Sequence, residues 1–392
     1  MFEQRKKKKS SEQGPAASPL QKKRSGGLDA PFLIIVLILV VFGLIMLFSA
    51  SYATALYRFK DSFHFIKDQV LFAAIGLAAM YIASRVDYHI FHRLALPLMA
   101  ASFILLVVVL FMPPINNAHR WITLPGGHGT LQPSEIAKFA IIVLFAHIIS
   151  INHEKMKRFS YGIIPFMVIL LPVVVLMLLE PHLSGTILIV AIGAIMMFVG
   201  GTSLRWFALG GGVFAGGLSA ALLAFPDLVP YAMDRIEMWK NPYLDMQDKG
   251  HQTVQSMLAI GSGGVFGLGL GNSRQKHLYV PEPQNDFIFS IICEELGFIG
   301  AMVVILLFVA LLIRGSVLAL RAKDKFGTML VVGIIAQVTV QAVLNIAVVT
   351  NTIPNTGISL PFFSYGGTSL MMLLGEMGIV LSVSRQGAPP AT

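Results

Sequence analysis

An aspartate that follows two prolines is the first candidate for chemistry in this chain. Pro281 and Pro283 keep their segment extended, because proline lacks an N–H and biases the preceding residue away from helix. A long apolar run follows, so a helix is expected to begin at about Asn285 or Asp286. A carboxylate there faces free backbone N–H groups and the positive end of the helix dipole. We therefore predict that Asp286 is ionised, and that it either only caps the helix or also accepts a proton.

A glutamate and a lysine form the second candidate. Glu135 and Lys138 lie three residues apart, on one face of the apolar helix that begins Gln-Pro-Ser-Glu-Ile-Ala-Lys. Charges at membrane depth cost roughly 3 kcal/mol each on insertion scales, so the two side chains are expected to neutralise each other. The pair is either a structural ion pair near the outer interface or part of a cavity wall. His182 has no second histidine near it, so a metal site is not expected there.

The elements that must position these residues are membrane helices. Of the 392 residues, 55% are hydrophobic and only 12% are charged, whereas a soluble surface needs about a quarter charged residues. The single cysteine, Cys293, lies in an apolar run, which excludes a disulfide framework and a cysteine-based metal site. Composition therefore predicts an all-α polytopic membrane protein.

Apolar runs predict about ten transmembrane helices, with one large extracellular loop between helices 7 and 8. The expected spans are 31–52, 69–84, 94–112, 133–150, 161–179, 184–200, 204–225, 286–313, 327–349 and 364–383. The chain then divides into a basic disordered tail (1–29), a ten-span membrane domain (30–385) that contains the loop 226–285, and a short tail (386–392).

The distribution of basic residues orients the bundle. With the N-terminus inside, 19 of the 29 lysines and arginines fall on the inner side, so the positive-inside rule favours a cytoplasmic N-terminus. An even number of spans also places the C-terminus in the cytoplasm. Eight of the basic residues lie in the tail 1–29, which is expected to stay near anionic lipid headgroups rather than to bind nucleic acid. In the outer loop, Arg274 and Lys276 put two cations shortly before Asp286.

Several motifs together carry a resemblance to a known family. They are Asn-Ala-His-Arg-Trp-Ile (117–122), Gln-Pro-Ser-Glu-Ile-Ala-Lys (132–138), Gly-His-Gln-Thr-Val-Gln-Ser (250–256), Ser-Arg-Gln-Lys (273–276), Pro-Glu-Pro-Gln-Asn-Asp-Phe-Ile-Phe (281–289), Glu-Glu-Leu-Gly-Phe-Ile-Gly (294–300) and Pro-Phe-Phe-Ser-Tyr-Gly-Gly-Thr-Ser-Leu (361–370). In this order they resemble the SEDS family of bacterial cell-wall proteins, whose branches are FtsW, RodA and SpoVE. Ser-Arg-Gln-Lys before Pro-Glu-Pro is more similar to the FtsW and SpoVE branch.

The resemblance implies a peptidoglycan glycosyltransferase that acts in cell division or in spore cortex synthesis. Such an enzyme polymerises lipid II, the undecaprenyl-pyrophosphate-linked disaccharide-pentapeptide, at the outer face of the cytoplasmic membrane. The implied partners are a class B penicillin-binding protein transpeptidase and divisome or sporulation proteins. A divalent cation, Mg or Mn, is allowed by the family, but this sequence offers no ligand cluster that shows one.

The resemblance also implies roles for individual residues. Asp286 matches the family's essential aspartate, and it would take the proton from the acceptor sugar's 4-hydroxyl. The substrate-binding candidates, several of them cations for the leaving pyrophosphate, are Arg120, Glu135, Lys138, Arg274 and Lys276. Two positions depart from the family pattern: Gln284-Asn285 stands where many members have His-Thr, and His182 stands where many have Asp.

Two other functions remain as alternatives. A flippase that moves lipid II across the bilayer explains acids and lysines inside the spans, but not a distinctive acid beneath a large outer loop. In the eighth span, the small or polar residues Ser290, Cys293 and Gly297 fall on the same helical face as Asp286. A membrane scaffold for cell-wall enzymes fits the tail and the helical bundle, but it gives this polar face no function.

Overall fold

The computed structural model describes residues 27–113, 119–123, 130–180, 182–212, 237–246 and 250–387. Its α-helices are α1 (Ala30–Phe59), α2 (His64–Arg85), α3 (His89–Val109), α4 (Pro133–Asn152), α5 (Phe159–Gly162), α6 (Ile164–Leu179), α7 (Leu183–Val199), α10 (His251–Gly263), α11 (Ile288–Arg321), α12 (Lys325–Val349) and α13 (Gly367–Gln386). The described residues also contain two 3-10 turns, η2 (His153–Lys155) and η3 (Pro242–Asp245), one small hairpin, β1 (Ile122–Thr123) with β2 (Thr130–Leu131), and helical residues at 204–212 and 237–240. The predicted tails 1–29 and 386–392 lie almost wholly outside these ranges.

Eight helices in the described ranges are long and apolar enough to cross a membrane, with α5 and α6 forming one continuous span. The expected span 184–200 corresponds to α7, an apolar helix that is shorter than the others. The expected span 204–225 lies mostly outside the described residues, as does part of the loop 226–285. The prediction of an all-α polytopic membrane protein is confirmed, while the total of ten spans stays a prediction.

Apolar side chains cover the outer faces of the bundle. Exposed examples are Ile82 on α2 (62%), Leu96 on α3 (67%), Val168 on α6 (66%) and Leu306 on α11 (57%). In the central helices α4, α12 and α13, between 61% and 67% of the apolar stretch is buried, against 28% in α2 and α3. Such large exposed apolar faces are typical of helices that contact lipid.

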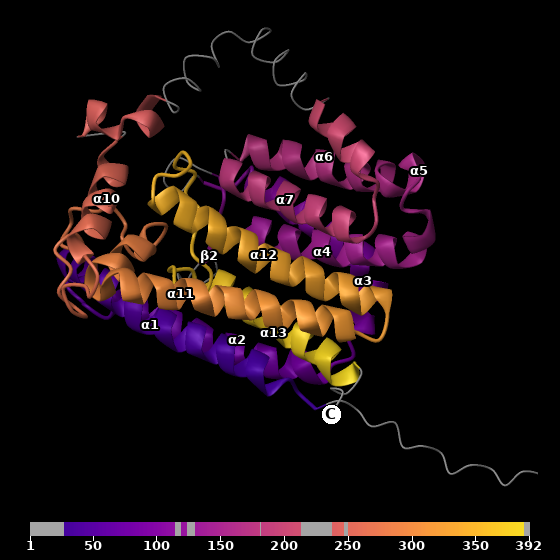
Figure 1. Cartoon of the computed structure of the whole chain (residues 1–392), viewed down its shortest axis with the longest axis horizontal. Helices are drawn as coiled ribbons and strands as arrows, with labels where there is room; N and C mark the ends of the chain where they lie inside the picture. Colours follow the sequence, from indigo (N-terminus) through magenta and orange to yellow (C-terminus); the bar gives the residue numbers. More distant parts are fainter. Residues whose placement is uncertain are drawn as a thin grey trace, which may run out of the picture.

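Polar contacts show which segments meet at the end of the bundle opposite α10 (Figure 1). Asp29, before α1, accepts hydrogen bonds from Arg314 near the end of α11, at 2.8 Å from its Nε. His89, at the start of α3, contacts Asp324, at the start of α12, at 2.7 Å. The C-terminal end of α13 lies at this end as well (Figure 1). Both ends of the described chain are therefore on one side of the bundle.

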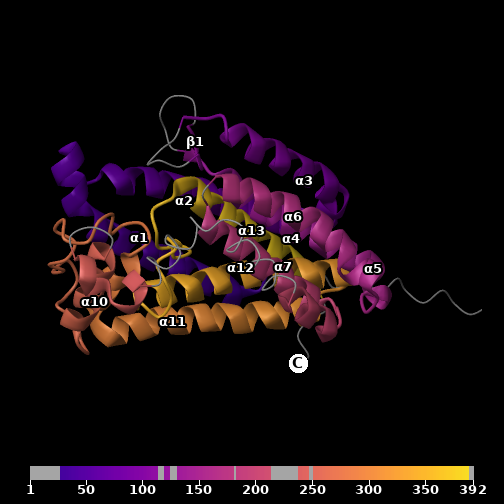
Figure 2. The ribbon, with the colours of Figure 1, turned by 90° about the horizontal axis from the view of Figure 1, so that it is seen from above.

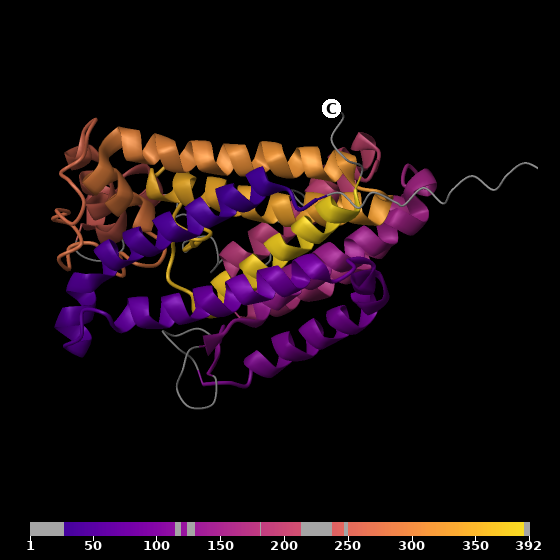
Figure 3. The same cartoon turned by 90° about the horizontal axis from the view of Figure 1, so that it is seen from below.

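The other end carries α10, the β1–β2 hairpin and the loop that precedes α11. Figure 2 shows α10 beside the start of α11, and Figure 3 shows α13 running along α2. The glycine-rich run 261–271 packs directly on the backbone of α11, because its glycines have no side chains to keep the two backbones apart. At Gly267 (φ +79°) a Cβ would lie 2.2 Å from the carbonyl oxygen of Glu295, and α11 itself kinks at Gly297 (φ +65°).

Candidate functional site

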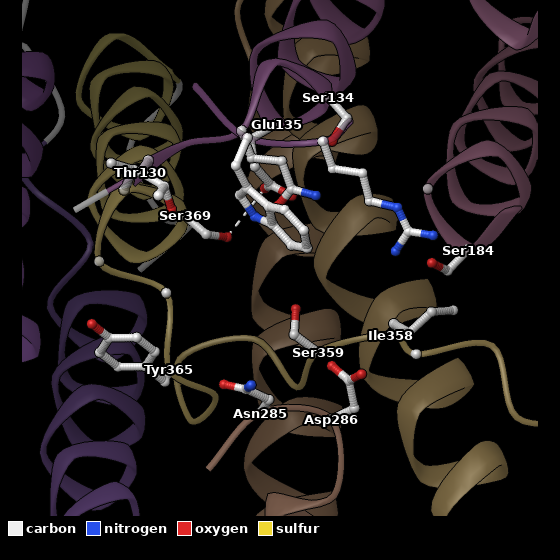
Figure 4. Close-up of a pocket in the computed structure, with 18 of the residues that line it drawn as sticks. Thr130, Ser134, Glu135, Ser184, Asn285, Asp286, Ile358, Ser359, Tyr365 and Ser369 are labelled. Atoms are coloured by element: carbon white, nitrogen blue, oxygen red, sulfur yellow. Dashed lines mark hydrogen bonds between the residues drawn. The ribbon is translucent and has the colours of Figure 1, made fainter. Parts of the chain in front are cut away.

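A polar cavity of about 650 Å³ lies at this end of the bundle, where α4, α7 and α13 begin (Figure 4). Its walls come from α2, α4, α7, α12 and α13 and from the segments 120–123, 282–286 and 357–366. Ligand sites for small molecules have volumes of this order. Of the residues singled out in the sequence, the cavity brings together Arg120, Glu135, Lys138 and Asp286.

Asp286 does not cap the helix that follows it. The helix α11 begins at Ile288, its N-cap residue is Phe287, and no side chain caps it. The expectation that the helix begins at Asn285 or Asp286 and that Asp286 caps it is therefore wrong. The Asp286 carboxylate accepts no hydrogen bond from any described residue and points into the cavity (Figure 4). The chain stays non-helical through Phe287, so Asp286 belongs to the loop before α11 and not to its first turn.

The backbone around Asp286 is held firmly from neighbouring elements. The Asn345 side chain, on α12, donates a hydrogen bond to the carbonyl oxygen of Asp286 at 2.7 Å and another to that of Ile358 at 2.6 Å. Ser364 donates to the carbonyl oxygen of Asn285 at 2.6 Å. At Gly357 a Cβ would lie 3.1 Å from the Asp286 carboxylate, so a glycine there leaves room for it. The carboxylate is thus placed by its main chain while its own oxygens remain available.

The electrostatic surroundings move the pKa of Asp286 toward neutrality. Burial is the largest cause and raises the pKa from 3.8 to about 6, the Arg120 charge opposes the rise, and the Glu282 charge adds to it. Burial lowers the pKa of Arg120, which the charges of Asp286 and Glu180 partly restore. A carboxylate whose pKa lies near the working pH is well suited to take a proton from a hydroxyl group.

Glu135 and Lys138 form the predicted ion pair, with 2.7 Å between Oε1 and Nζ. Lys138 is only 3% exposed, so the pair lies in a poorly solvated part of the wall. Ser369, at the start of α13, donates to the other oxygen of Glu135 at 3.2 Å, and Lys138 donates to Gln341 at 3.4 Å. The pair also lines the cavity, so both alternatives predicted from the sequence, an ion pair and a part of a cavity wall, are found in the same two residues.

Two of the predicted substrate-binding residues lie away from the cavity lining. Lys276 is fully buried and donates to Glu295 on α11 at 2.7 Å and to the carbonyl oxygen of Gly271 at 2.6 Å. Arg274 is exposed, and its backbone N–H donates to Glu294 at 3.0 Å. Both residues therefore belong to the anchoring of the loop on α11, a role that their position near Asp286 in the sequence did not reveal.

A protein-built metal site is not evident at the cavity. In the described part of the chain, no group of three or more His, Cys, Asp or Glu side chains is arranged to hold a metal ion. Mg²⁺ is often held by one or two carboxylates together with substrate phosphates, and these residues alone do not supply such a cage. The divalent cation therefore stays a prediction.

Sequence reasoning missed the segment 357–359 and the buried residues at the start of α7. Glu180, at the end of α6, and His182, just before α7, are both moved toward the neutral form by burial, which raises the pKa of Glu180 to about 8 and lowers that of His182 to about 3. Sequence reasoning treats His182 only as a rejected metal ligand and as a departure from the family pattern. Gly357 carried no signal beyond being a glycine between two apolar helices.

The chain matches known proteins over nearly its whole described length. The family model for FtsW, RodA and SpoVE, described as "Cell cycle protein", matches residues 30–388. "Stage V sporulation protein E" of Bacillus subtilis (strain 168) is 42% identical over 361 residues, which cover 91% of this chain and 97% of that protein. "Probable peptidoglycan glycosyltransferase FtsW" of Geobacter sp. (strain M18) is 40% identical and covers 92% and 98%.

Solved structures show the same fold. A chain from the structure described as "Structural coordination of polymerization and crosslinking by a peptidoglycan synthase complex" superimposes with a TM-score of 0.76 and 29% identity, covering 91% of this chain and 98% of that one. The rod shape determining protein RodA of Thermus thermophilus superimposes with a TM-score of 0.67 and 27% identity, covering 91% and 97%.

Proposed function

Since this chain belongs to the FtsW, RodA and SpoVE family, we propose that it is a peptidoglycan glycosyltransferase that polymerises lipid II in cell division or sporulation. Membership confirms the resemblance drawn from the sequence motifs. Relatives named FtsW and SpoVE at 40% to 42% identity agree with the branch that Ser-Arg-Gln-Lys had indicated.

One observation carries the proposal: the Asp286 carboxylate, which has no hydrogen-bond donor among the described residues, lies in a polar cavity with Arg120 and the Glu135–Lys138 pair. Asp286 takes the proton from the acceptor sugar's 4-hydroxyl as that oxygen bonds to the donor's anomeric carbon. The bond from this carbon to the donor phosphate breaks, and its electron pair leaves with the pyrophosphate. A cation in the same cavity stabilises the charge that develops there.

The cavity faces the outer side of the membrane in this proposal, and both chain termini are cytoplasmic. The ends of the described chain lie together at the opposite end of the bundle, where Arg314 binds Asp29. That end also carries the basic residues Lys155, Arg321 and Lys323, which favour the cytoplasmic side.

A transpeptidase partner is proposed by analogy. A solved chain that this protein covers almost completely is part of a peptidoglycan synthase complex whose description names both polymerization and crosslinking. We therefore expect this chain to work with a class B penicillin-binding protein that crosslinks the new strands, together with divisome or sporulation proteins.

The decisive experiment replaces Asp286 with Asn. Purified wild-type and Asp286→Asn proteins are incubated with labelled lipid II, and glycan strands are resolved on a gel. Because the side chain caps nothing, folding is expected to be unchanged, whereas loss of a general base lowers the rate by a hundredfold to ten-thousandfold. Asp61→Asn serves as the matched control, since Asp61 is partly exposed, bonds Lys67 and does not line the cavity.

The outcome separates the polymerase from its alternatives. Lipid II binding without strand synthesis by the Asp286→Asn protein supports the base. Strand synthesis by the Asp286→Asn protein at the wild-type rate would show that Asp286 is not the base. If even the wild-type protein makes no strands but moves labelled lipid II across vesicles, the flippase hypothesis replaces the polymerase.

A further inference from the structure

Three long helices begin at the cavity without a side-chain cap. The N-cap residues of α4, α7 and α13 are Gln132, His182 and Gly366, and none of them accepts a hydrogen bond from its helix through its side chain. At the opposite end of the bundle, Asp29 caps α1 at 3.0 Å and Asp324 caps α12 at 2.8 Å, whereas α3 and α6 begin there without a side-chain cap. The first N–H groups of a helix need some partner. At α4, Pro133 has no N–H and the N–H of Glu135 bonds the carbonyl oxygen of Gln132 at 3.1 Å, so only part of these first turns is left for water or a ligand.

Side chains at two of these helix starts are buried without partners. Ser134, in the first turn of α4, and Ser184, in the first turn of α7, are 1% and 3% exposed, and their hydroxyl groups have no hydrogen-bond partner among the described residues. His182 is 8% exposed, and its Nδ1 also lacks a partner in the described part of the chain. Figure 4 shows Ser134 across the cavity from Asp286 and Ser184 at one side of it. Buried polar groups without a hydrogen-bond partner are rare in native proteins, so a cluster of them indicates a bound water molecule or ligand.

The charges on this wall favour an anion. Glu135 is neutralised by Lys138, and burial lowers the pKa of His182 to about 3, which makes it a neutral hydrogen-bonding group. Glu180, beside the wall, is also mostly neutral at pH 7, because burial raises its pKa to about 8. The Arg120 guanidinium adds a positive charge to the cavity lining, and each helix N-terminus is equivalent to about half a positive charge.

The other acids of the cavity come from different elements. Glu282 pairs with Arg58, while Asp68 lies on α2 and Asp286 precedes α11. The cavity is thus polarised, with hydroxyl groups, helix N-termini and a guanidinium on one side and carboxylates on the other.

We propose that the starts of α4 and α7, with Ser134, Ser184 and His182, bind the diphosphate of the donor lipid, while Asp286 serves the acceptor hydroxyl across the cavity. Helix N-termini and arginine are the elements that proteins use for phosphate groups. This subsite rests on the proposed function, and it assigns the donor and the acceptor to opposite walls.

Inorganic pyrophosphate is the probe for this subsite. Its Kd is measured by equilibrium dialysis with the full-length protein in phosphatidylcholine nanodiscs. The double variant Ser134→Ala with Ser184→Ala removes two donors to a charged ligand, and the expected loss of affinity is on the order of tenfold or more. Ser102→Ala is the matched control, because Ser102 is buried, bonds Met99 within α3 and does not line the cavity. Its Kd is expected to equal that of the wild type.

Three results would overturn the subsite: no pyrophosphate binding by the wild type, an unchanged Kd in the double variant, or an equal loss in Ser102→Ala. A parallel series in phosphatidylglycerol nanodiscs tests the other source of phosphate. If the anionic lipid abolishes pyrophosphate binding in the wild type, the wall binds lipid headgroups instead. Pyrophosphate binding is measured without catalysis. Strand synthesis by the Asp286→Asn protein would therefore refute the role of Asp286 as the base, but it would leave the measured Kd for pyrophosphate unchanged.

Discussion

The pH dependence of strand synthesis should report the ionisation of Asp286. Its pKa of about 6 instead of 3.8 means that ionising it inside the protein costs about 3 kcal/mol more than in a free peptide. If the carboxylate is the base, the rate at pH 5 should be about a tenth of the plateau, because only that fraction is ionised. An aspartate with an ordinary pKa would leave the rate almost unchanged between pH 5 and 7.

Substitutions at Arg120 and at Glu282 should move the half-maximal pH of strand synthesis in opposite directions. Arg120 favours the carboxylate form, so Arg120→Gln should shift the half-maximal pH upward, while Arg120→Lys, which keeps the charge, should shift it less. The Glu282 charge disfavours the carboxylate form, so Glu282→Gln should shift the half-maximal pH downward. The assay measures kcat with labelled lipid II from pH 5 to 8. A flat profile, or shifts of the same sign in both variants, would refute the assignment of the base.

Acid unfolding through this group does not confound the assay. Because the pKa of Asp286 is raised in the folded protein, the folded state binds this proton more tightly than the unfolded chain does. Lowering the pH from 7 toward 4 therefore adds stability through Asp286, and raising the pH through 6 removes it. A melting curve at each pH checks that any loss of rate at pH 5 occurs in folded protein.

Two more predictions concern the ion pair and the topology. Glu135→Gln or Lys138→Met alone leaves a buried charge unpaired and should lower the free energy of unfolding by on the order of 3 kcal/mol or more. The double variant should lose less stability, and thermal melts measure the difference. Single variants as stable as the wild type would contradict the pairing. In a Cys293→Ala background, a cysteine at His251 should react with an impermeant thiol reagent in intact cells, and one at Lys323 should not; the reverse pattern would invert the orientation.

The composition of the chain and the spacing of its residues were sufficient to predict the class of fold and much of the candidate site. Long apolar runs reveal membrane helices because each must satisfy its own backbone. Nine of the predicted spans therefore correspond to described helices, with ends that differ by up to eight residues, as at Arg321 of α11, and the span 204–225 stays a prediction. The Glu135–Lys138 pair was predictable because both residues lie on one helix at a fixed spacing. Gln337 on α12 donates to Glu376 on α13 at 3.0 Å, an interhelical hydrogen bond of the kind that polar residues inside spans usually make.

What could not be predicted depends on contacts between distant segments. Lys276 and Arg274 are close to Asp286 in the chain, but the loop folds onto α11 and carries them away from the cavity. Asn345 and Gly357 reach Asp286 from α12 and from the loop after it, and no local pattern signals this. The uncapped starts of α4 and α7 become meaningful only once both are seen to face one cavity.

The anchoring of the loop explains why Asp286 can change its charge without loss of structure. Glu294 accepts hydrogen bonds from Ser273 and from the backbone N–H of Arg274, and Glu295 binds Lys276 and Ser49. These two carboxylates are fully buried and hold the chain that leads to Asp286. Since the Asp286 carboxylate accepts no hydrogen bond from a described residue, protonating it breaks none of these contacts. In the proposed mechanism, the acids that fix the loop are therefore different from Asp286, which exchanges the proton.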